Sequence, residues 1–431
     1  MAGCFRSLLS TLSGCSWSRQ TSGELRIANS GESGYGHSRV TFTRLRFMLV
    51  LLFPLLFSLS AKADEPPAQI LAHYMPWFTA DTPKWGYHWT MNHFDPEKVG
   101  EDGRREIASR DYPEIGPYDS GDPHVLEYHA LLMKFSGIDG VIIDWYGTRD
   151  FRDYPMIDRN TRALIPWLKK ARLTFTVCYE DQTIKHMIAE GAIKATDDVA
   201  EMAKEMNKLA DEYFGDEAWV KSNGKPLLLT FGPQHFQAES WKQSMQQCKS
   251  PPVVFSLPHQ QKNFGFAGAF AWPPVHFGGQ IAPDQWQNSL RSIYEKYEPN
   301  QLIPVVFPSF DDFYAEAKVQ NGYGVIESRD GQTFAESLKM ARETKSQLIQ
   351  IATWNDFGEG TTIEPTREYG LRYLEHLIDS DSDAKFAKPD LTLPLQLYRL
   401  RKSNANLADK VAEALFAGDC DLARDLLKQS R

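Results

Sequence analysis

Eight short apolar runs, separated by amphipathic stretches, dominate the sequence from residue 69 onward. Each run is hydrophobic almost throughout, which is typical of parallel strands that are covered on both faces. The runs span residues 69–78, 138–147, 173–181, 225–233, 252–259, 267–274, 302–310 and 348–356. Eight such strands joined by helices predict an α/β fold, the closed (β/α)8 or TIM barrel, which needs roughly 250 residues.

The intervening stretches predict the helices of this barrel, because their apolar residues recur with a period near 3.6. The predicted helices span residues 123–135, 157–172, 197–214, 240–248, 284–297, 334–346 and 366–378. Residues 260–266 are too few for a helix, so we expect one barrel helix to be missing or displaced. An open doubly wound sheet is the alternative, but no glycine-rich phosphate loop follows the first run, which disfavours it.

Two segments do not fit the repeating unit. Residues 79–120 form a long loop after the first strand, and its many aromatic and histidine side chains favour an ordered wall of an active site. Residues 386–431 predict a small helical tail, in which Pro394 suits a first helical turn. We therefore expect three parts, namely a leader at 1–63, a barrel at 64–385 and a helical extension at 386–431.

The leader has the order of a secretory signal peptide. An apolar run at 47–60 follows Arg44 and Arg46 and precedes the small-residue exit Ala61-Lys62-Ala63. The run of 14 residues is shorter than the roughly 20 residues that span a membrane, although an uncleaved anchor is the alternative. We expect cleavage after Ala63, a secreted or periplasmic protein and no stable membrane insertion afterwards.

Beyond the leader the chain is acidic. Seven of the 47 Lys and Arg residues and two of the 56 Asp and Glu residues lie in residues 1–63, which leaves a net charge of −14. Such a chain without a basic run is a poor nucleic-acid binder. Cys178, Cys248 and Cys420 lie too far apart for a disulfide framework or a zinc motif. We expect no nucleic-acid partner, no metal and no cofactor, and the sequence leaves the oligomeric state open.

Polar and aromatic side chains follow most of the predicted strands. The carboxyl ends of barrel strands face the active site, and aromatic rings there can stack on the flat C–H faces of sugars. We therefore expect a carbohydrate substrate. The predicted substrate-binding residues are His73, Tyr74, His88, Trp89, Asp144, Trp145, Tyr146, Glu180, Trp272, Trp354 and Asn355.

The segment 354–360 holds the predicted catalytic pair, Asp356 and Glu359. Hydrolysis of a glycosidic bond needs a proton donor at the leaving oxygen and a second carboxylate. The two residues lie three apart just past the eighth strand, and Gly358 and Gly360 let the backbone turn so that both side chains can point into one cavity. An exposed acidic turn is the alternative.

The sequence ATWNDFGEGTTIEP, residues 352–365, resembles the C-terminal motif of glycoside hydrolase family 99, the endo-α-mannosidases. It is equally similar to the Trp-Asn-Asp-x-Gly-Glu motif of family 71, the endo-α-1,3-glucanases. Residues 112–147 also resemble family 99 in their Tyr-Pro-Glu, Gly-x-Tyr, Asp-Pro, Glu-x-His and Trp-Tyr positions. The resemblance spans roughly residues 69–385.

This resemblance implies retention of configuration through a 1,2-anhydro sugar. Asp356 would be the base on the 2-hydroxyl of the substrate and Glu359 the general acid, while Trp145, Tyr74, His88 and Glu180 would line the sugar subsites. Family 99 has Glu where this chain has Asp356, and a displacement of about 1 Å can cost roughly 100-fold in rate. Family 71 has Asp there, and Asp144 or Glu180 stays open as the partner of Glu359.

The predicted function is hydrolysis of α-glycosidic bonds in a saccharide of the α-mannan or α-1,3-glucan type, with endo action expected. One alternative is a hydrolase of another plant or algal polysaccharide. A second alternative is a barrel that binds carbohydrate without cleaving it, which the Asp at position 356 leaves open.

Overall fold

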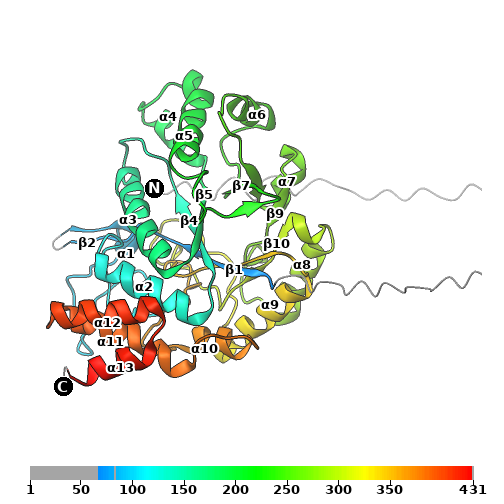
Figure 1. Cartoon of the computed structure of the whole chain (residues 1–431). Helices are drawn as coiled ribbons and strands as arrows, with labels where there is room; N and C mark the ends of the chain where they lie inside the picture. Colours follow the sequence, from blue (N-terminus) through cyan, green and yellow to red (C-terminus); the bar gives the residue numbers. More distant parts are fainter. Residues whose placement is uncertain (1–66, 82–83, 430–431) are drawn as a thin grey trace, which may run out of the picture. The chain divides into compact units, whose positions relative to one another are not determined.

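Each of the eight apolar runs contains a strand of one parallel sheet (Figure 1). The structure is a computed structural model that describes residues 67–81 and 84–429. The strands are β1 (Gln69–Tyr74), β4 (Gly140–Trp145), β5 (Thr174–Tyr179), β7 (Lys225–Thr230), β8 (Val253–Ser256), β9 (Gly268–Phe270), β10 (Leu302–Ile303) with β11 (Val305–Val306), and β12 (Leu348–Ile351). The predicted α/β barrel is confirmed.

Pro304 divides the seventh strand without opening the barrel. β10 pairs with β9, and β11 pairs with β12, all in parallel. Proline has no N–H group to donate, but the carbonyl of Pro304 accepts a hydrogen bond from the backbone N–H of Gln350 at 3.0 Å. The strand at 302–306 therefore bonds to the sixth strand on one side and to the eighth on the other, which closes the barrel.

Alternation along the strands decides which side chains reach the barrel interior. The interior cluster of buried apolar residues includes Leu71 on β1 and Ile142 on β4. Because side chains of a strand point alternately to its two faces, His73 and Asp144, each two residues further on, face the same interior. Tyr74 faces the helices instead and belongs to the cluster beneath them.

Helices cover the outside of the barrel (Figure 1). They are α2 (Pro123–Ser136), α3 (Tyr154–Ala171), α4 (Gln182–Ala189), α5 (Asp198–Glu212), α6 (Ala238–Gln246), α7 (Pro258–Phe264), α8 (Pro283–Tyr294), α9 (Gln332–Glu343) and α10 (Arg372–Asp379). Local signals set their ends, as expected. Asp122 caps α2 by accepting from the N–H of His124 at 2.8 Å, and Gly137 ends it at a φ of 80°.

Two expectations about the connections are wrong. The connection after the fifth strand does hold a helix, α7, because Pro258 begins it within residues expected to be strand. The helix expected at 366–378 begins only at Arg372, because Thr366 and Gly370 form a bridge that closes a turn before it. In addition, α4 fills a segment for which no helix is predicted.

The long loop after β1 packs against the segment that holds the predicted catalytic pair. It contains β2 (Ala80–Asp81), β3 (Lys84–Trp85) and α1 (Tyr87–Thr90). Trp89 is fully buried, and its indole N–H donates to the carbonyl of Tyr118 at 2.9 Å. The Trp89 ring lies 4.2 Å from that of Phe78 and 5.3 Å from that of Phe357. Since Phe357 lies between Asp356 and Glu359, this loop supports the catalytic segment directly.

The C-terminal helices pack on α2, and Phe416 of α12 also stacks on Trp167 of α3 (Figure 1, orange and red). They are α11 (Leu393–Arg401), α12 (Ala405–Ala417) and α13 (Cys420–Lys428), preceded by the 3-10 helix η4 (Lys388–Thr392). Ring contacts hold them, with centroids 4.4 Å apart for Phe135 and Phe386 and 5.7 Å apart for Tyr128 and Tyr398. Arg401 also donates two hydrogen bonds of 2.8 Å to the buried carboxylate of Glu127.

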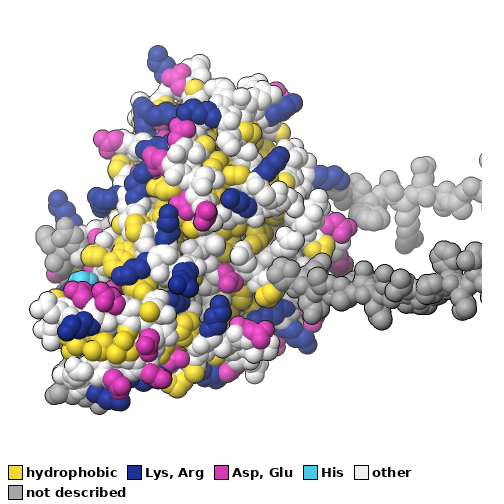
Figure 2. Space-filling view, in the orientation of Figure 1, with side chains coloured by type: hydrophobic (Ala, Val, Ile, Leu, Met, Phe, Trp, Pro, Cys, Tyr) yellow, Lys and Arg dark blue, Asp and Glu magenta, His cyan; other side chains and the backbone are white. Residues whose placement is uncertain are grey.

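The remaining elements are short. They are β6 (Lys221–Ser222) and the 3-10 helices η1 (Ala195–Asp197), η2 (Pro299–Gln301) and η3 (Arg329–Gly331). The predicted leader at residues 1–63 lies outside the described residues. In the part of the chain that the structure describes, every helix is too short or too polar to cross a membrane. Figure 2 shows basic and acidic side chains interspersed over the visible face.

Candidate active site

The segment that follows β12 folds back on itself and carries both predicted catalytic residues. The N–H of Thr353 donates to the carbonyl of Thr361 at 2.9 Å, and the Thr353 hydroxyl accepts from the N–H of Asp356 at 2.7 Å. Gly360 has a φ of 64°, and a Cβ there would lie 2.9 Å from the carbonyl oxygen of Asp311. Only glycine meets both conditions, so the turn that positions the pair depends on this residue.

Asp356 is held by backbone donors. Its side chain is 7% exposed, and its Oδ1 accepts from the N–H of Glu359 at 3.1 Å. Burial raises the pKa of Asp356 to about 7, while hydrogen bonds from the N–H groups of Glu359 and Gly358 act in the opposite direction. The two donors stabilise the charged form, so Asp356 can hold or release a proton near neutral pH.

Glu359 lies in the same buried site, and its surroundings also favour the protonated form. Its side chain is 5% exposed, and its Oε1 accepts from the hydroxyl of Tyr314 at 3.1 Å. Burial raises the pKa of Glu359 well above its ordinary value, and the charge of Asp356 raises it further. Hydrogen bonds from Tyr314 and Trp272 oppose this rise without cancelling it. A carboxyl whose pKa is raised in this way is suited to act as a general acid.

Asp144 and Glu180 belong to the same electrostatic group. Burial raises the pKa of Glu180 to about 7. Burial also raises the pKa of Asp144 well above its ordinary value, and the charges of Glu180, Asp356 and Glu359 add to this effect. None of the ion pairs between the described residues involves these four carboxyls. Ionisation of one of these carboxyls therefore opposes ionisation of its neighbours.

Several predicted substrate-binding residues lie with this group. His73 is buried in the barrel interior, and its ring meets the half-buried ring of Trp272 edge-on at 5.1 Å. His88 stacks on Trp77 with ring centroids 4.1 Å apart, and Trp77 lies 6.3 Å from Tyr146. His88 in α1 and Tyr146 just past β4 are partly exposed, so their rings can contact a saccharide.

Other predicted substrate-binding residues lie outside the barrel interior, packed against helices and loops. Tyr74 is fully buried against α2, and its hydroxyl lies 3.0 Å from Nδ1 of His129. Trp145 points toward α3, where its indole N–H donates to Asp158 at 3.1 Å. Trp354 is fully buried beside the ring of His129. With Trp89, these side chains form the layer that supports the site.

Asn355 fixes the catalytic segment to the end of β1. Its Oδ1 accepts from the N–H of Met75 at 2.8 Å, and its Nδ2 donates to the carbonyl of Met75 at 3.0 Å. The same Nδ2 lies 3.1 Å from the hydroxyl of Tyr118. The side chain is fully buried, so Asn355 positions its neighbour Asp356 instead of contacting a sugar.

Sequence reasoning missed two polar residues of the site, both in the loop after the seventh strand. Asp312 accepts from the N–H groups of Tyr314 and Tyr323 at 3.0 and 2.7 Å, and its charge raises the pKa of Asp356 and Glu359. Tyr314 donates to Glu359. The strand-end position of Asp312 was a usable signal, whereas the contact of Tyr314 depends on the path of the loop.

The family described as "Glycosyltransferase WbsX" matches residues 109–377, which is more than half of the chain. The chain belongs to this family.

Relatives of the WbsX-family chain agree with the predicted glycoside hydrolase class. A mouse protein named "Glycoprotein endo-alpha-1,2-mannosidase-like protein" is 26% identical over 73% of this chain and 76% of its own length. The mouse "Glycoprotein endo-alpha-1,2-mannosidase" is 25% identical over 74% of each chain. The solved GH99 endo-alpha-mannosidase of Bacteroides thetaiotaomicron has a TM-score of 0.54 at 17% identity, with 78% of this chain and 98% of that chain covered. The barrel is thus of the type found in glycoside hydrolase family 99 (GH99), and the expected relationship to family 99 is confirmed.

Proposed function

We propose that this protein is a retaining endo-glycoside hydrolase of α-mannosides, with Glu359 as the general acid and Asp356 as the base. The observation that carries the proposal is the shared buried site of these two carboxyls, whose surroundings differ. Backbone N–H groups stabilise charge on Asp356, whereas burial and the charge of Asp356 favour a proton on Glu359. Pairs of titratable groups with separated pKa values commonly divide into base and acid.

In the proposed reaction, Asp356 removes the proton of the sugar 2-hydroxyl, and that oxygen attacks the anomeric carbon. Glu359 gives its proton to the leaving glycosidic oxygen, so that bond breaks and a 1,2-anhydro sugar forms. Glu359, now ionised, then removes a proton from water, whose oxygen opens the strained ring at the anomeric carbon while Asp356 returns its proton to the 2-oxygen. Two inversions at this carbon retain the configuration.

The names of the relatives support mannose as the sugar, because one is named an endo-α-1,2-mannosidase and another an endo-α-1,2-mannosidase-like protein. A panel of α-1,2-, α-1,3- and α-1,6-linked manno-oligosaccharides with an α-1,3-glucan tests this. Proton NMR during the first minutes identifies the bond cleaved and the anomer released. We expect cleavage of an α-mannoside with the α-anomer appearing first. Release of the β-anomer first would contradict retention, and cleavage of the glucan alone would contradict the mannoside.

The variant Glu359→Gln separates an enzyme from a binding protein. We expect it to keep sugar affinity in calorimetry and to lose about 100-fold to 10,000-fold in rate, the usual contribution of a general acid. The matched control is Glu413→Gln on the exposed face of α12, which should leave both unchanged. Sugar binding without turnover by the unmodified protein would instead support a non-catalytic barrel.

The description of the family favours a second candidate, glycosyl transfer. A sugar hydroxyl can open the same intermediate in place of water. Digestion in the presence of excess acceptor mannoside, followed by mass spectrometry, distinguishes the two reactions. Products longer than the substrate would support transfer, and their absence together with released mannosides supports hydrolysis.

We propose further that the protein is exported and cleaved after Ala63. The basis is the order of charges, apolar run and small residues at 44–63. N-terminal sequencing of protein recovered from the producing cells should begin at Asp64. A mature N-terminus at residue 1 or at Met48 would contradict the proposal.

A further inference from the structure

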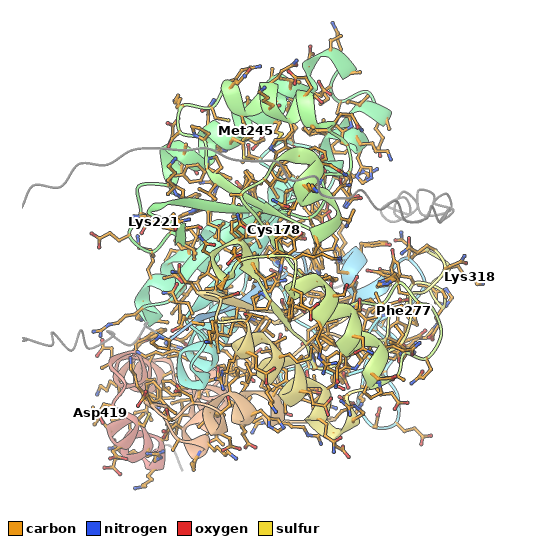
Figure 3. The ribbon with its side chains drawn as sticks, turned by 90° about the vertical axis from the view of Figure 1, so that its right-hand side faces the viewer. Cys178, Lys221, Met245, Phe277, Lys318 and Asp419 are labelled. Atoms are coloured by element: carbon orange, nitrogen blue, oxygen red, sulfur yellow. The ribbon has the colours of Figure 1, made fainter. Side chains whose placement is uncertain are left out.

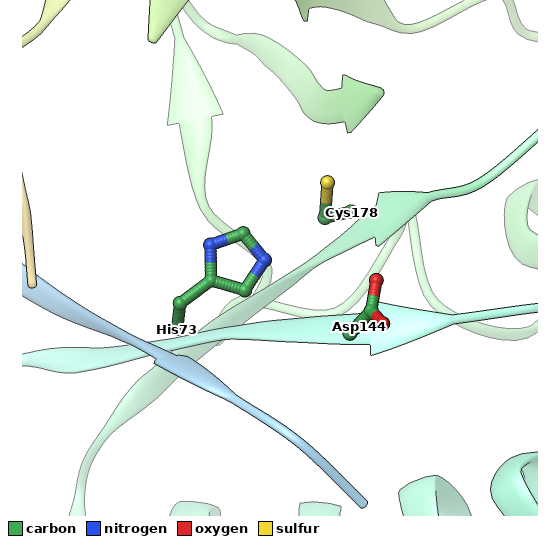
Figure 4. A group of neighbouring side chains, drawn as sticks. All are labelled: His73, Asp144 and Cys178. Carbon is green, nitrogen blue, oxygen red and sulfur yellow. The ribbon is translucent and has the colours of Figure 1, made fainter. Parts of the chain in front are cut away.

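Three side chains that could bind a metal ion meet inside the barrel. His73 on β1, Asp144 on β4 and Cys178 on β5 come from adjacent strands, and one ligand atom of each lies within 4.8 Å of the others. Figure 4 shows one ring nitrogen of His73 directed toward the space between the Cys178 sulfur and the Asp144 carboxyl. Figure 3 places Cys178 near the centre of the ribbon, remote from the labelled surface residue Asp419.

The three side chains have unused ligand capacity in a buried place. They are 1%, 3% and 0% exposed for His73, Asp144 and Cys178. Oδ2 of Asp144 accepts no hydrogen bond from the residues that the structure describes, although buried carboxylate oxygens are normally paired. Burial removes the hydration of this oxygen, and no hydrogen bond compensates for the loss. A bound cation would supply the interaction that this oxygen lacks.

The residues around the trio suit a metal site. The side chain of Gln350 lies beside the His73 imidazole, and its amide oxygen has no hydrogen-bond partner among the described residues. An acceptor in this position is what commonly orients a metal-binding histidine. The backbone N–H of Phe231 interacts with the Cys178 sulfur, and that donor would stabilise a thiolate.

We propose that His73, Asp144 and Cys178 form a site for a thiophilic divalent cation such as Zn²⁺. A nitrogen, an oxygen and a sulfur ligand are the set that Zn²⁺ prefers, with a fourth position left to water or another oxygen. Zinc–ligand bonds of about 2.0 to 2.3 Å place tetrahedral ligands about 3.5 Å apart. The three ligand atoms therefore need to approach one another by up to about 1.3 Å when the cation binds.

Binding of the cation releases protons from the ligands. The Cys178 thiol and the Asp144 carboxyl each lose a proton to solvent when they bind the cation, while neutral His73 contributes its lone pair. No step needs an oxidant or a reductant. Affinity should therefore rise with pH. The inference does not depend on glycosidase activity.

Co²⁺ tests the site in the full chain, because a thiolate bound to Co²⁺ gives a charge-transfer band in the near ultraviolet. We expect one equivalent of Co²⁺ to produce this band and one equivalent of Zn²⁺ to abolish it. Cys178→Ser should lose the band. A matched variant in which Cys4, Cys15, Cys248 and Cys420 are all replaced by Ser should keep it, since it retains Cys178 alone.

Three results would overturn the proposal. They are absence of the band in the unmodified protein, its survival in Cys178→Ser, or its loss in the variant that retains only Cys178 while circular dichroism shows that this variant is folded. If Cys178→Ser does not fold, the Co²⁺ band is compared between the unmodified protein and His73→Gln. A band that is unchanged in His73→Gln would overturn the proposal. Because Co²⁺ binding is measured without sugar, a failed metal site leaves the proposed hydrolase untouched, and an inactive protein that binds Co²⁺ leaves the metal site standing.

Discussion

The hydroxyl of Tyr314 lies 3.1 Å from Oε1 of Glu359, so a hydrogen bond joins the loop after the seventh strand to the loop after the eighth. This donor stabilises the carboxylate and thereby lowers the pKa of Glu359, against the larger effect of burial. The proton affinity of the proposed acid is thus adjusted by a residue from a different strand.

Replacing Tyr314 by Phe should raise the pKa of Glu359. If Glu359 is the acid, the alkaline limb of the pH profile of kcat/KM moves to higher pH. Loss of a hydrogen bond worth about 1 kcal/mol should reduce the rate roughly 3- to 10-fold near the optimum. Tyr297→Phe is the control, because its hydroxyl bonds to the carbonyl of Pro258 at 3.1 Å, outside the site. An alkaline limb that stays in place in Tyr314→Phe would contradict this role.

The buried carboxyls should make the protein less stable as pH rises. The pKa of Asp356 is raised to about 7 from an ordinary value of 3.8, so the folded state binds the proton more tightly than the unfolded state does. This contribution is complete below pH 4 and is lost as pH rises through 7. Asp356→Asn removes the charge, so urea unfolding should show a gain of about 1 to 3 kcal/mol at pH 8 relative to the parent and little at pH 4. Equal effects at both pH values would count against the raised pKa.

Tyr74→Phe separates a supporting residue from a sugar-binding one. The Tyr74 hydroxyl bonds to His129 under α2, so its loss should cost about 1 to 2 kcal/mol in the free energy of unfolding. We expect KM for the saccharide to stay within about twofold of the parent value, since the ring faces away from the barrel interior. A large rise in KM with an unchanged free energy of unfolding would contradict this prediction and indicate that Tyr74 contacts the saccharide.

The ion pair of Arg401 and Glu127 should anchor the C-terminal helices. Arg401→Met leaves the carboxylate of Glu127 buried without its partner, since Glu127 is 1% exposed. The free energy of unfolding should therefore fall by about 3 to 5 kcal/mol. Arg399→Met is the matched control, because its pair with Glu114 is exposed and should contribute less than about 1 kcal/mol. The double variant Glu127→Gln with Arg401→Met should recover part of the loss, whereas full additivity would rule out the coupling.

The barrel could be predicted because each strand is encoded by its own apolar run. Both ends of α2 could also be predicted, because Asp122 at its start and Gly137 at its finish are local signals. The failures lie where structure depends on distant contacts. α7 begins at Pro258 within an apolar run, and the bridge between Thr366 and Gly370 delays α10.

The candidate site was predictable in its central pair and less so around it. Asp356 and Glu359 lie together because the turn between them is local. Tyr74 and Trp145 could have been set aside from the sequence, because each directly follows a residue that faces the barrel interior and strands alternate. The meeting of His73, Asp144 and Cys178 has no signal in their spacing, since it arises from the register of three strands.

The packing of the C-terminal helices on α2 has a consequence for biosynthesis. Glu127 and its partner Arg401 are 274 residues apart, and ribosomes add roughly 5 to 20 residues per second. The apolar surface of α2 therefore stays exposed for tens of seconds, until the C-terminal helices have been synthesised. Nascent chains that stop before these helices expose this apolar surface to chaperones and proteases. The helices between residues 393 and 428 thus decide whether α2, the first barrel helix, is protected.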